Sequence, residues 1–296
     1  MNQAFQSRPP LDVAQQGQLL DQAFDFTGKN VFVAGGTSGI NFGIALLFAQ
    51  QGANVAVLSR SQEKVDRAVE ELTKQATHTE QKSLGFSADV RDYTAIEQAL
   101  QACHKAWGDL DVVVSGAAGN FPAMAKDLSP NGFKAVIDID LLGTFHVNKA
   151  AYAVLKKPGG SIINISAPQA FIAMELQVHV CAAKAGVDMV TKVLAQEWGP
   201  DGLRVNSIVP GPIDHTEGMD RLAPTPAIKQ AVADSVPTRQ MGDRLDVARA
   251  ALYLASPIAA FVSGVILPAD SGWHLSGAQA AMLQSARMFE HLQSKP

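Results

Sequence analysis

Residues 30–40 read Asn-Val-Phe-Val-Ala-Gly-Gly-Thr-Ser-Gly-Ile, an apolar run that passes into a glycine-rich turn. A short apolar run that ends at glycine is typical of a buried strand. The segment 42–51 then predicts a helix, which Gly52 ends. Glycines in such a turn let backbone amides approach a pyrophosphate, and the helix N-terminus adds partial positive charge. We therefore predict a dinucleotide site formed by Gly35, Thr37, Ser38, Gly39 and Ile40.

The rest of the chain repeats this alternation of strand and helix. Apolar runs predict further strands at residues 54–59, 83–88, 110–115, 161–166, 204–209 and 264–269. Ser61 and Asp92 stand where they can cap helices, and the segments 132–155 and 180–198 predict two long helices. Strands that alternate with helices indicate a parallel sheet covered on both faces. The predicted fold class is therefore α/β, a single Rossmann-type doubly wound domain with a seven-stranded parallel sheet.

One domain accounts for most of the chain. We expect it to span residues 30–275, between an N-terminal extension at 1–29 and a C-terminal tail at 276–296. Its one long connection, residues 210–237, is rich in proline and polar residues. A connection of this length in a compact domain is usually a lid or a binding segment. We expect a lid that begins at Thr216, Glu217 and Met219.

Composition excludes several classes of protein. The net charge of −4 and the 18% of charged residues do not favour a nucleic-acid surface. Two isolated cysteines and seven scattered histidines predict neither a disulfide framework nor a metal site. No apolar run reaches membrane-spanning length. The final Gln-Ser-Lys-Pro lacks the terminal leucine of a peroxisomal tripeptide, so we expect a cytoplasmic location.

The residue after the second predicted strand bears on the choice of cofactor. Dinucleotide sites that prefer NAD commonly place a carboxylate there, against the ribose 2′-hydroxyl. This chain has Arg60, whose guanidinium suits a 2′-phosphate, so we expect NADPH. Asp89, after the third predicted strand, has two interpretations: a residue facing the adenine, or one that caps a helix or shapes a turn.

Taken together, these motifs resemble the short-chain dehydrogenase/reductase family over about residues 26–275. The resemblance is carried by GGTSGI at 35–40, Asp89-Val90, GAAGN at 116–120, INIS at 163–166, Lys184, RVNSIVPGPI at 204–213 and ADSG at 269–272. A narrower set looks like the 2,4-dienoyl-CoA reductases, particularly those of the peroxisomal type. That set comprises AAGNF at 117–121, DIDLLGTF at 138–145, QVHVCAAKAGVD at 177–188, EWGPDGLRVNSIVPGPIDHTEGMDRL at 197–222 and DSGWHL at 270–275.

The resemblance implies further cofactor contacts. Lys184 would hold the nicotinamide ribose, and the segment from Pro210 through Gly211 to Ile213 would cover the nicotinamide. Val90 and Ala117 belong to the matching motifs and are counted among the expected cofactor-binding residues. A homotetramer assembled through the helices at 132–155 and 180–198 is also implied, and the small residues Ala182, Ala183, Ala185 and Gly186 would permit close packing.

The chain departs from the family pattern at one reactive position. Members that act on alcohols and ketones place a tyrosine four residues before the lysine, to exchange a proton with the substrate oxygen. Here that position is Val180, the usual serine position falls near Ala167, and a tyrosine used farther upstream aligns with Gln169. Tyr152 matches the spacing Tyr-x-x-x-Lys but precedes the fifth predicted strand, so we predict that it is not catalytic.

Four residues are the catalytic candidates: Lys184, Asp140, Asn120 and Asp270. The resemblance implies that Asn120 bonds the substrate thioester oxygen and that Asp140 joins the proton path; an ion pair with Lys184 is the alternative for Asp140. Asp270 is a second implied acid, or else a turn residue. We expect Asp138 to be structural and Cys181 to be a packing residue. His179 has two interpretations, a substitute for the missing tyrosine or a structural histidine; it lies about 100° from Val180 around a helix, which favours the structural one.

The missing tyrosine counts against an ordinary alcohol dehydrogenase. Conjugate reduction spreads negative charge into a thioester dienolate, which hydrogen bonds can stabilise before a carbon atom is protonated. The predicted function is NADPH-dependent reduction of a 2,4-dienoyl-CoA, an acyl-CoA substrate, to a 3-enoyl-CoA in unsaturated fatty-acid degradation. Two alternatives stay open: another reductase of acyl-thioester or carbonyl substrates with the same fold, and a noncatalytic NADPH-binding protein.

Overall fold

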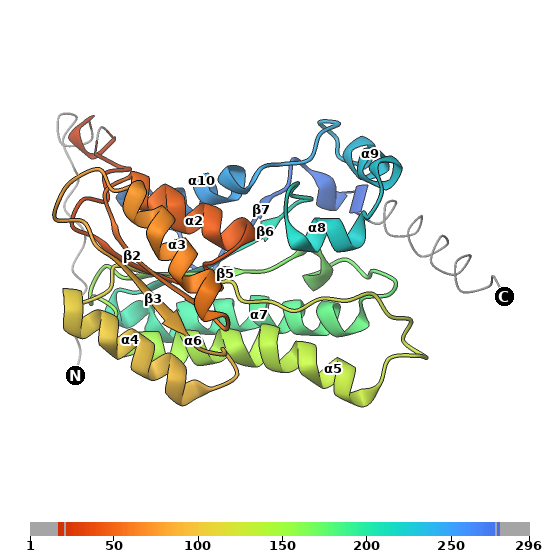
Figure 1. The fold of residues 1–296 in the computed structure, drawn as a ribbon, viewed down its shortest axis with the longest axis horizontal. Helices are drawn as coiled ribbons and strands as arrows, with labels where there is room; N and C mark the ends of the chain where they lie inside the picture. Colours follow the sequence, from red (N-terminus) through yellow and green to blue (C-terminus); the bar gives the residue numbers. More distant parts are fainter. Residues whose placement is uncertain (1–16, 21, 276, 279–296) are drawn as a thin grey trace.

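A seven-stranded parallel sheet forms the centre of the computed structural model, which describes residues 17–20, 22–275 and 277–278 (Figure 1). The strand order is β3-β2-β1-β4-β5-β6-β7, and every neighbouring pair is parallel. The strands are β1 (Asn30–Ala34), β2 (Asn54–Ser59), β3 (Ser83–Ser87), β4 (Val112–Ser115), β5 (Ser161–Ile165), β6 (Arg204–Pro210) and β7 (Ile266–Ala269). The predicted doubly wound α/β fold is therefore confirmed.

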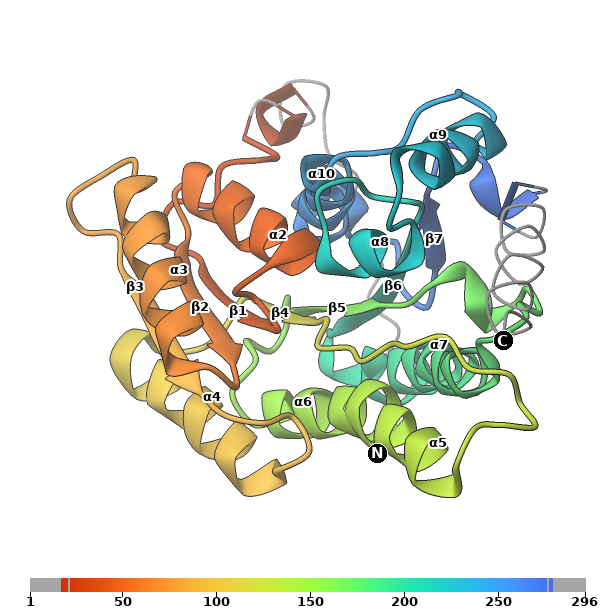
Figure 2. The same cartoon turned by 45° about the vertical axis from the view of Figure 1, so that its right-hand side comes forward.

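Helices cover both faces of the sheet, as Figures 1 and 2 show. Side chains of β1 alternate between the two faces: Val31 and Val33 enter one buried cluster, while Phe32 and Ala34 enter the other. The first cluster lies under α2 (Gly39–Gln50), α3 (Gln62–Lys74) and α10 (Arg244–Ala255), and the second under α4 (Tyr93–Trp107), α6 (Gly143–Tyr152) and α7 (Val178–Trp198).

Several helix boundaries follow from local capping. The Ser61 side chain accepts a hydrogen bond from the Lys64 backbone at 3.4 Å, and Asp92 accepts one from Ala95 at 3.1 Å. Both predicted caps are thus confirmed, because each satisfies a backbone N–H that has no partner inside its helix. The expected helix at 42–51 was placed too late: α2 begins at Gly39, directly after the glycine-rich turn.

The predicted helix 132–155 forms as an uninterrupted helical stretch, but it spans residues 130–152 and its hydrogen-bonding pattern changes within it. The chain forms α5 (Pro130–Val136), a π-helical segment (Ile137–Leu142) and then α6. At Gly143 a Cβ atom would come within 2.7 Å of the Val90 side chain, so glycine permits close packing where α6 begins. A wider turn of this kind rotates the side chains around it and often occurs at functional sites. Here it carries Asp138 and Asp140.

The connection at 210–237 is also more ordered than expected. It contains α8 (Glu217–Leu222) and α9 (Pro226–Ser235), which periodicity alone had not indicated. Thr216 and Thr225 cap these two helices, and Pro226 stands at the first turn of α9, where its missing N–H costs nothing. Helix α10 was likewise not assigned from the sequence. The expected extension at 1–29 and tail at 276–296 lie mostly outside the described residues.

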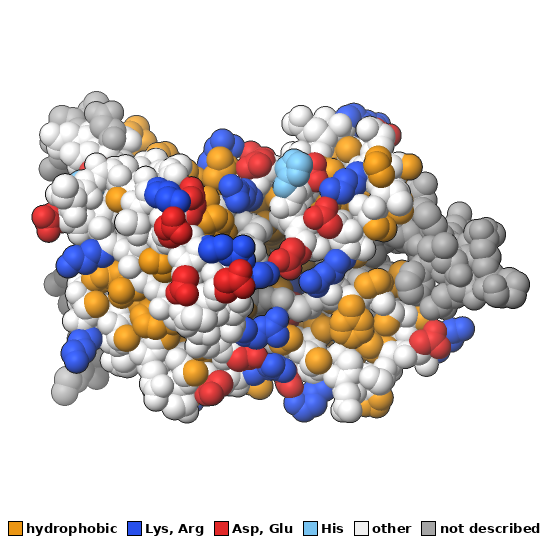
Figure 3. All heavy atoms as spheres, in the orientation of Figure 1, with side chains coloured by type: hydrophobic (Ala, Val, Ile, Leu, Met, Phe, Trp, Pro, Cys, Tyr) orange, Lys and Arg blue, Asp and Glu red, His pale blue; other side chains and the backbone are white. Residues whose placement is uncertain are grey.

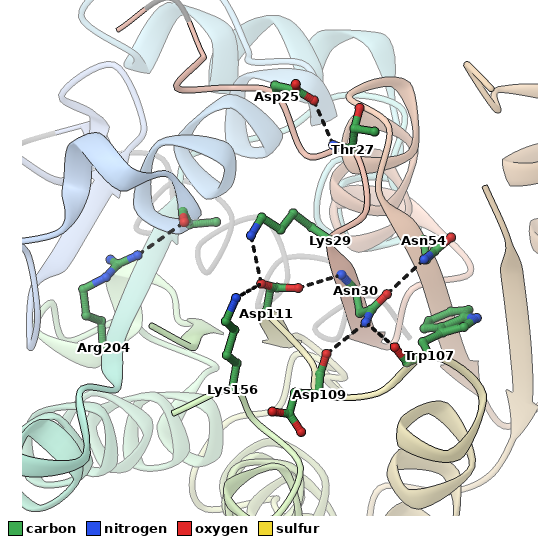
Figure 4. A network of polar contacts seen from close by, with 11 residues as sticks. Asp25, Thr27, Lys29, Asn30, Asn54, Trp107, Asp109, Asp111, Lys156 and Arg204 are labelled. Atoms are coloured by element: carbon green, nitrogen blue, oxygen red, sulfur yellow. Dashed lines mark hydrogen bonds and ion pairs between the residues drawn. The ribbon is translucent and has the colours of Figure 1, made fainter. Parts of the chain in front are cut away.

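A polar network ties together the amino ends of the strands (Figure 4). Asp111 accepts hydrogen bonds from the Asn30 backbone at 3.0 Å and from Lys29 Nζ at 3.3 Å. The buried Asn30 amide donates to the backbone oxygens of Trp107 and Asp109 and accepts from Asn54 Nδ2 at 2.9 Å. The polar groups at the amino ends of the strands therefore bond to one another. The opposite edge of the sheet, where the strands end, is the edge at which open α/β sheets bind their ligands.

Candidate active site

A cleft of about 510 Å³ opens at the carboxyl ends of the strands. The strand order reverses between β1 and β4, and ligands of open α/β sheets bind at such a reversal. Figure 2 shows α2 and α8 on one side of this edge and α6 with α7 on the other. In Figure 3 charged side chains of both signs surround the hollow in the middle of the molecular face.

The glycine-rich turn lines the cleft beside the N-terminus of α2. Ser38 is the N-cap residue but makes no side-chain cap, and the first turn of α2 has no acidic residue. The leading N–H groups of this helix therefore remain available to an anion. Gly35 has φ 77°, and a Cβ there would come within 2.9 Å of the Ala117 backbone, so no larger residue fits. Predicted residues Gly35, Thr37, Ser38, Gly39, Ile40 and Ala117 all line the cleft.

Charged residues lie at the outer end of the cleft, beyond β2 and β3. Arg60 lines it, and its guanidinium has no ion-pair partner in the part of the chain that the structure describes. Asp89 also lines the cleft, but Arg91 engages its carboxylate at 2.6 Å, and this hydrogen bond lowers the pKa of Asp89. Lys64 contacts Glu217 of α8 at 2.9 Å, so an exposed ion pair crosses the mouth.

The innermost charges are Asp140 and Lys184, whose side chains are 1% and 6% exposed. Lys184 Nζ lies 3.3 Å from Asp140 Oδ2 and donates to the Ile165 backbone oxygen at 3.0 Å. Asp140 Oδ1 accepts from the Gly119 N–H at 2.7 Å. The predicted neighbours thus meet, and the ion-pair alternative for Asp140 describes their contact. Asp138 pairs instead with the exposed Lys134, and its structural role stays a prediction.

Asn120 lies in the loop that follows β4 and lines the cleft. Its side-chain oxygen is buried and has no hydrogen-bond partner among the described residues. Buried amide oxygens are nearly always paired, so an unpaired one in a cleft is typical of a ligand contact. Ser166, directly after β5, also lines the cleft with a buried side chain. Sequence reasoning placed the serine position near Ala167 and missed Ser166, although the motif INIS ends on it.

Asp270 does not line the cleft. Its carboxylate accepts hydrogen bonds from the backbone of Gly272 at 3.0 Å and of His274 at 2.8 Å, and it also contacts the His274 ring at 2.8 Å. A carboxylate held by three donors has little capacity left for a substrate, which favours the turn interpretation of Asp270. Its backbone packs on Gly211, where a Cβ would come within 2.7 Å.

Val180 lies four residues before Lys184 on α7, and both residues line the cleft. Tyr152 is far from this edge: its hydroxyl donates to Asp201 at 2.6 Å, at the end of α6 that precedes β5. Tyr93 bonds Glu97, and Tyr253 lies on α10. None of the three tyrosines of the chain lines the cleft.

The segment after β6 forms the remaining wall. Pro210, Gly211 and Ile213 line the cleft as predicted, as does Val90 from the opposite side. The first part of the expected lid follows, with Thr216, Glu217 and Met219 also among the lining residues. The cleft is also lined by apolar side chains, which suit an acyl chain: Ile139, Met219, Leu222 and Trp273.

A family model described as enoyl-(acyl carrier protein) reductase matches residues 34–274. With the parallel sheet, the glycine-rich turn and the Lys184 position, this match shows that the chain belongs to the short-chain dehydrogenase/reductase family of oxidoreductases. A solved short chain dehydrogenase from Bacillus anthracis is similar over 83% of this chain and 97% of its own, with 37% identity and a TM-score of 0.72.

Two curated relatives are more similar in sequence. The peroxisomal 2,4-dienoyl-CoA reductase [(3E)-enoyl-CoA-producing] of Arabidopsis thaliana is 42% identical over 84% of this chain and 85% of its own length. The protein of the same name from Rattus norvegicus is 42% identical over 82% of this chain and 83% of its own. No helix in the described part of the chain is both long and apolar enough to cross a bilayer.

Proposed function

We propose that this protein reduces a conjugated 2,4-dienoyl-CoA thioester to a 3-enoyl-CoA with NADPH. The observation that carries the proposal is a cleft in which Val180 replaces the family tyrosine while Lys184 and Asp140 form a buried pair beside it. Such a cleft offers no phenol to protonate an alkoxide, yet it keeps the lysine that holds the cofactor. The 42% identity to dienoyl-CoA reductases supports the same choice.

The glycine-rich turn, Lys184 and the 210–213 segment would hold NADPH, which supplies a hydride when bound. The new C–H bond forms at C5 of the diene, the double bonds shift toward the thioester, and the electron pair reaches its oxygen. Asn120 lines the cleft, and the NH₂ group of its side chain can donate a hydrogen bond to that oxygen. A proton then bonds to C2, leaving the C3–C4 double bond. The buried ammonium group of Lys184, 3.3 Å from the Asp140 carboxylate, is the group in the cleft that can supply this proton.

The preference for NADPH rests on Arg60. Its guanidinium stands at the carboxyl end of β2 and lines the cleft, with Lys64 on the next helix also among the lining residues. Lys64 is paired with Glu217 and Asp89 with Arg91, which leaves the Arg60 guanidinium as the charge without an ion-pair partner among the described residues at this position. An unengaged cation suits a 2′-phosphate better than a 2′-hydroxyl.

The experiment is a turnover assay that follows the loss of NADPH absorbance. Purified protein is given a 2,4-dienoyl-CoA, a 2-enoyl-CoA or simple ketones, and Lys184→Met serves as the matched control. We expect turnover only with the dienoyl thioester, and loss of it in the control. Turnover of ketones alone would support an ordinary carbonyl reductase. Tight NADPH binding without turnover of any of these substrates would support the noncatalytic alternative.

We also propose a homotetramer that uses the outer surface of α6 and α7. Exposed apolar side chains lie on the π-helical segment (Leu142), on α6 (Phe145) and on α7 (Met189 and Val193). The exposed Ala182 and Ala185 lie on the same helix as Met189 and leave room for a second backbone. Sedimentation should give four chains per particle, and Met189→Glu should reduce that number.

A cytoplasmic location stays a prediction. The names of the relatives from Arabidopsis and rat place those proteins in peroxisomes. Microscopy of the full chain in its own cells, with cytosolic and peroxisomal markers, distinguishes the two locations.

A further inference from the structure

His179 is a buried titratable group that the proposed reaction does not use. Its side chain lies on α7, one residue before Val180, and is fully buried. Its Nε2 lies 3.0 Å from the backbone oxygen of Phe121, and the two rings have centroids 4.6 Å apart. Its other nitrogen, Nδ1, is buried and has no partner among the described residues.

These contacts determine the form of the imidazole. A carbonyl oxygen can only accept a hydrogen bond, so Nε2 must carry the proton and Nδ1 the lone pair. A second proton at Nδ1 would be buried without an acceptor. In agreement, burial is the main cause that lowers the pKa of His179 from its ordinary value. The ring is therefore a neutral donor and not an acid at neutral pH.

The donor acts on the loop that carries Asn120. Three backbone groups of this loop are held at alternate residues: Gly119 N–H by Asp140 at 2.7 Å, Phe121 oxygen by His179, and Ala123 N–H by the Leu176 oxygen at 3.0 Å. Asn120 lies between the first two of these anchors. Both anchoring side chains are buried, so their positions are set by the core and not by solvent.

We propose that His179 is a positioning residue, which holds the Phe121 carbonyl so that the Asn120 amide meets the thioester oxygen. The inference rests on the proposed function and adds a residue to it. Helix α7 carries both Lys184 and His179, so it also sets the position of Asn120. Lys184 and Asn120, which would face the substrate thioester from two sides, are thereby positioned by the same helix. A displacement of about 1 Å at such a site can reduce turnover about a hundredfold.

Two conservative variants separate the donor from the ring. The amide nitrogen of glutamine reaches the place of Nε2, whereas that of asparagine reaches only the place of Nδ1. We expect His179→Asn to lower kcat on a dienoyl-CoA about 10- to 100-fold. His179→Gln should keep kcat within about threefold of wild type, and both variants should keep NADPH affinity within about twofold. In the Asn120→Ala background, His179→Asn should have no further effect on kcat.

The possible outcomes are distinct. Equal losses in His179→Gln and His179→Asn would show that the imidazole itself is needed, which overturns the proposal. Full turnover in His179→Asn, or losses that add to that of Asn120→Ala, would also overturn it. If wild type does not turn over dienoyl-CoA, the proposed function fails and amide hydrogen exchange of the peptide 116–123 decides the inference. Faster exchange in His179→Asn alone supports it, and unchanged exchange in both variants refutes it.

Discussion

Asp140→Asn removes one charge from the buried pair with little change in shape. The asparagine oxygen can still accept from the Gly119 N–H, but its NH₂ group faces the Lys184 ammonium 3.3 Å from the original carboxylate oxygen. At an effective dielectric constant of about 20, the lost attraction is about 5 kcal/mol before the desolvation of both ions is subtracted. Breaking a buried pair typically costs about 3–5 kcal/mol of folding stability.

Turnover should respond as well, because the charge that holds the Lys184 proton beside the substrate is lost. We expect kcat on a dienoyl-CoA to fall about a hundredfold, which corresponds to about 2.7 kcal/mol. NADPH affinity should stay within about twofold, since the Lys184 bond to the Ile165 oxygen is unchanged. Steady-state kinetics, NADPH titration and urea unfolding measure the three quantities. A kcat within threefold of wild type would refute the role of Asp140 in proton supply.

Three further changes test other parts of the site. Arg60→Ala should raise the dissociation constant of NADPH about 10- to 100-fold, because a charged hydrogen bond to the 2′-phosphate is lost, and should leave that of NADH unchanged. Equal effects on the two dissociation constants would contradict this. Tyr152→Phe should keep kcat within a few-fold, because its hydroxyl bonds Asp201 away from the cleft. A thousandfold loss, about 4 kcal/mol, would show that this tyrosine is catalytic. Burial lowers the pKa of His179, so below about pH 6.5 the unfolded chain takes up a proton that the folded chain excludes, and unfolding free energy falls. His179→Gln should flatten this fall in urea titrations between pH 7 and pH 5, and an unchanged slope would count against the buried neutral form.

Much of the fold could be predicted because its signals are local. The strands of a parallel sheet are apolar over their whole length, so β1 and β2 were found residue for residue from their composition. Ser61 and Asp92 cap helices through atoms within three residues of themselves. The short helices α8 and α9 were missed because they have only 6 and 10 residues and the prolines around them resemble a loop.

By itself, the sequence determined the sheet, the glycine-rich turn, the position of Lys184 and the absence of a tyrosine before it. Only the tertiary structure decided which carboxylate forms an ion pair with Lys184. Asp140 and Asp270 are both aspartates, and the sequence alone did not choose between them. The π-helical segment brings Asp140 to the lysine, while backbone N–H groups of its own turn bond to Asp270. The same holds for His179, whose partner Phe121 belongs to a distant loop. Periodicity reports how neighbouring residues are exposed, whereas a buried polar contact depends on elements that packing brings together from far apart in the chain.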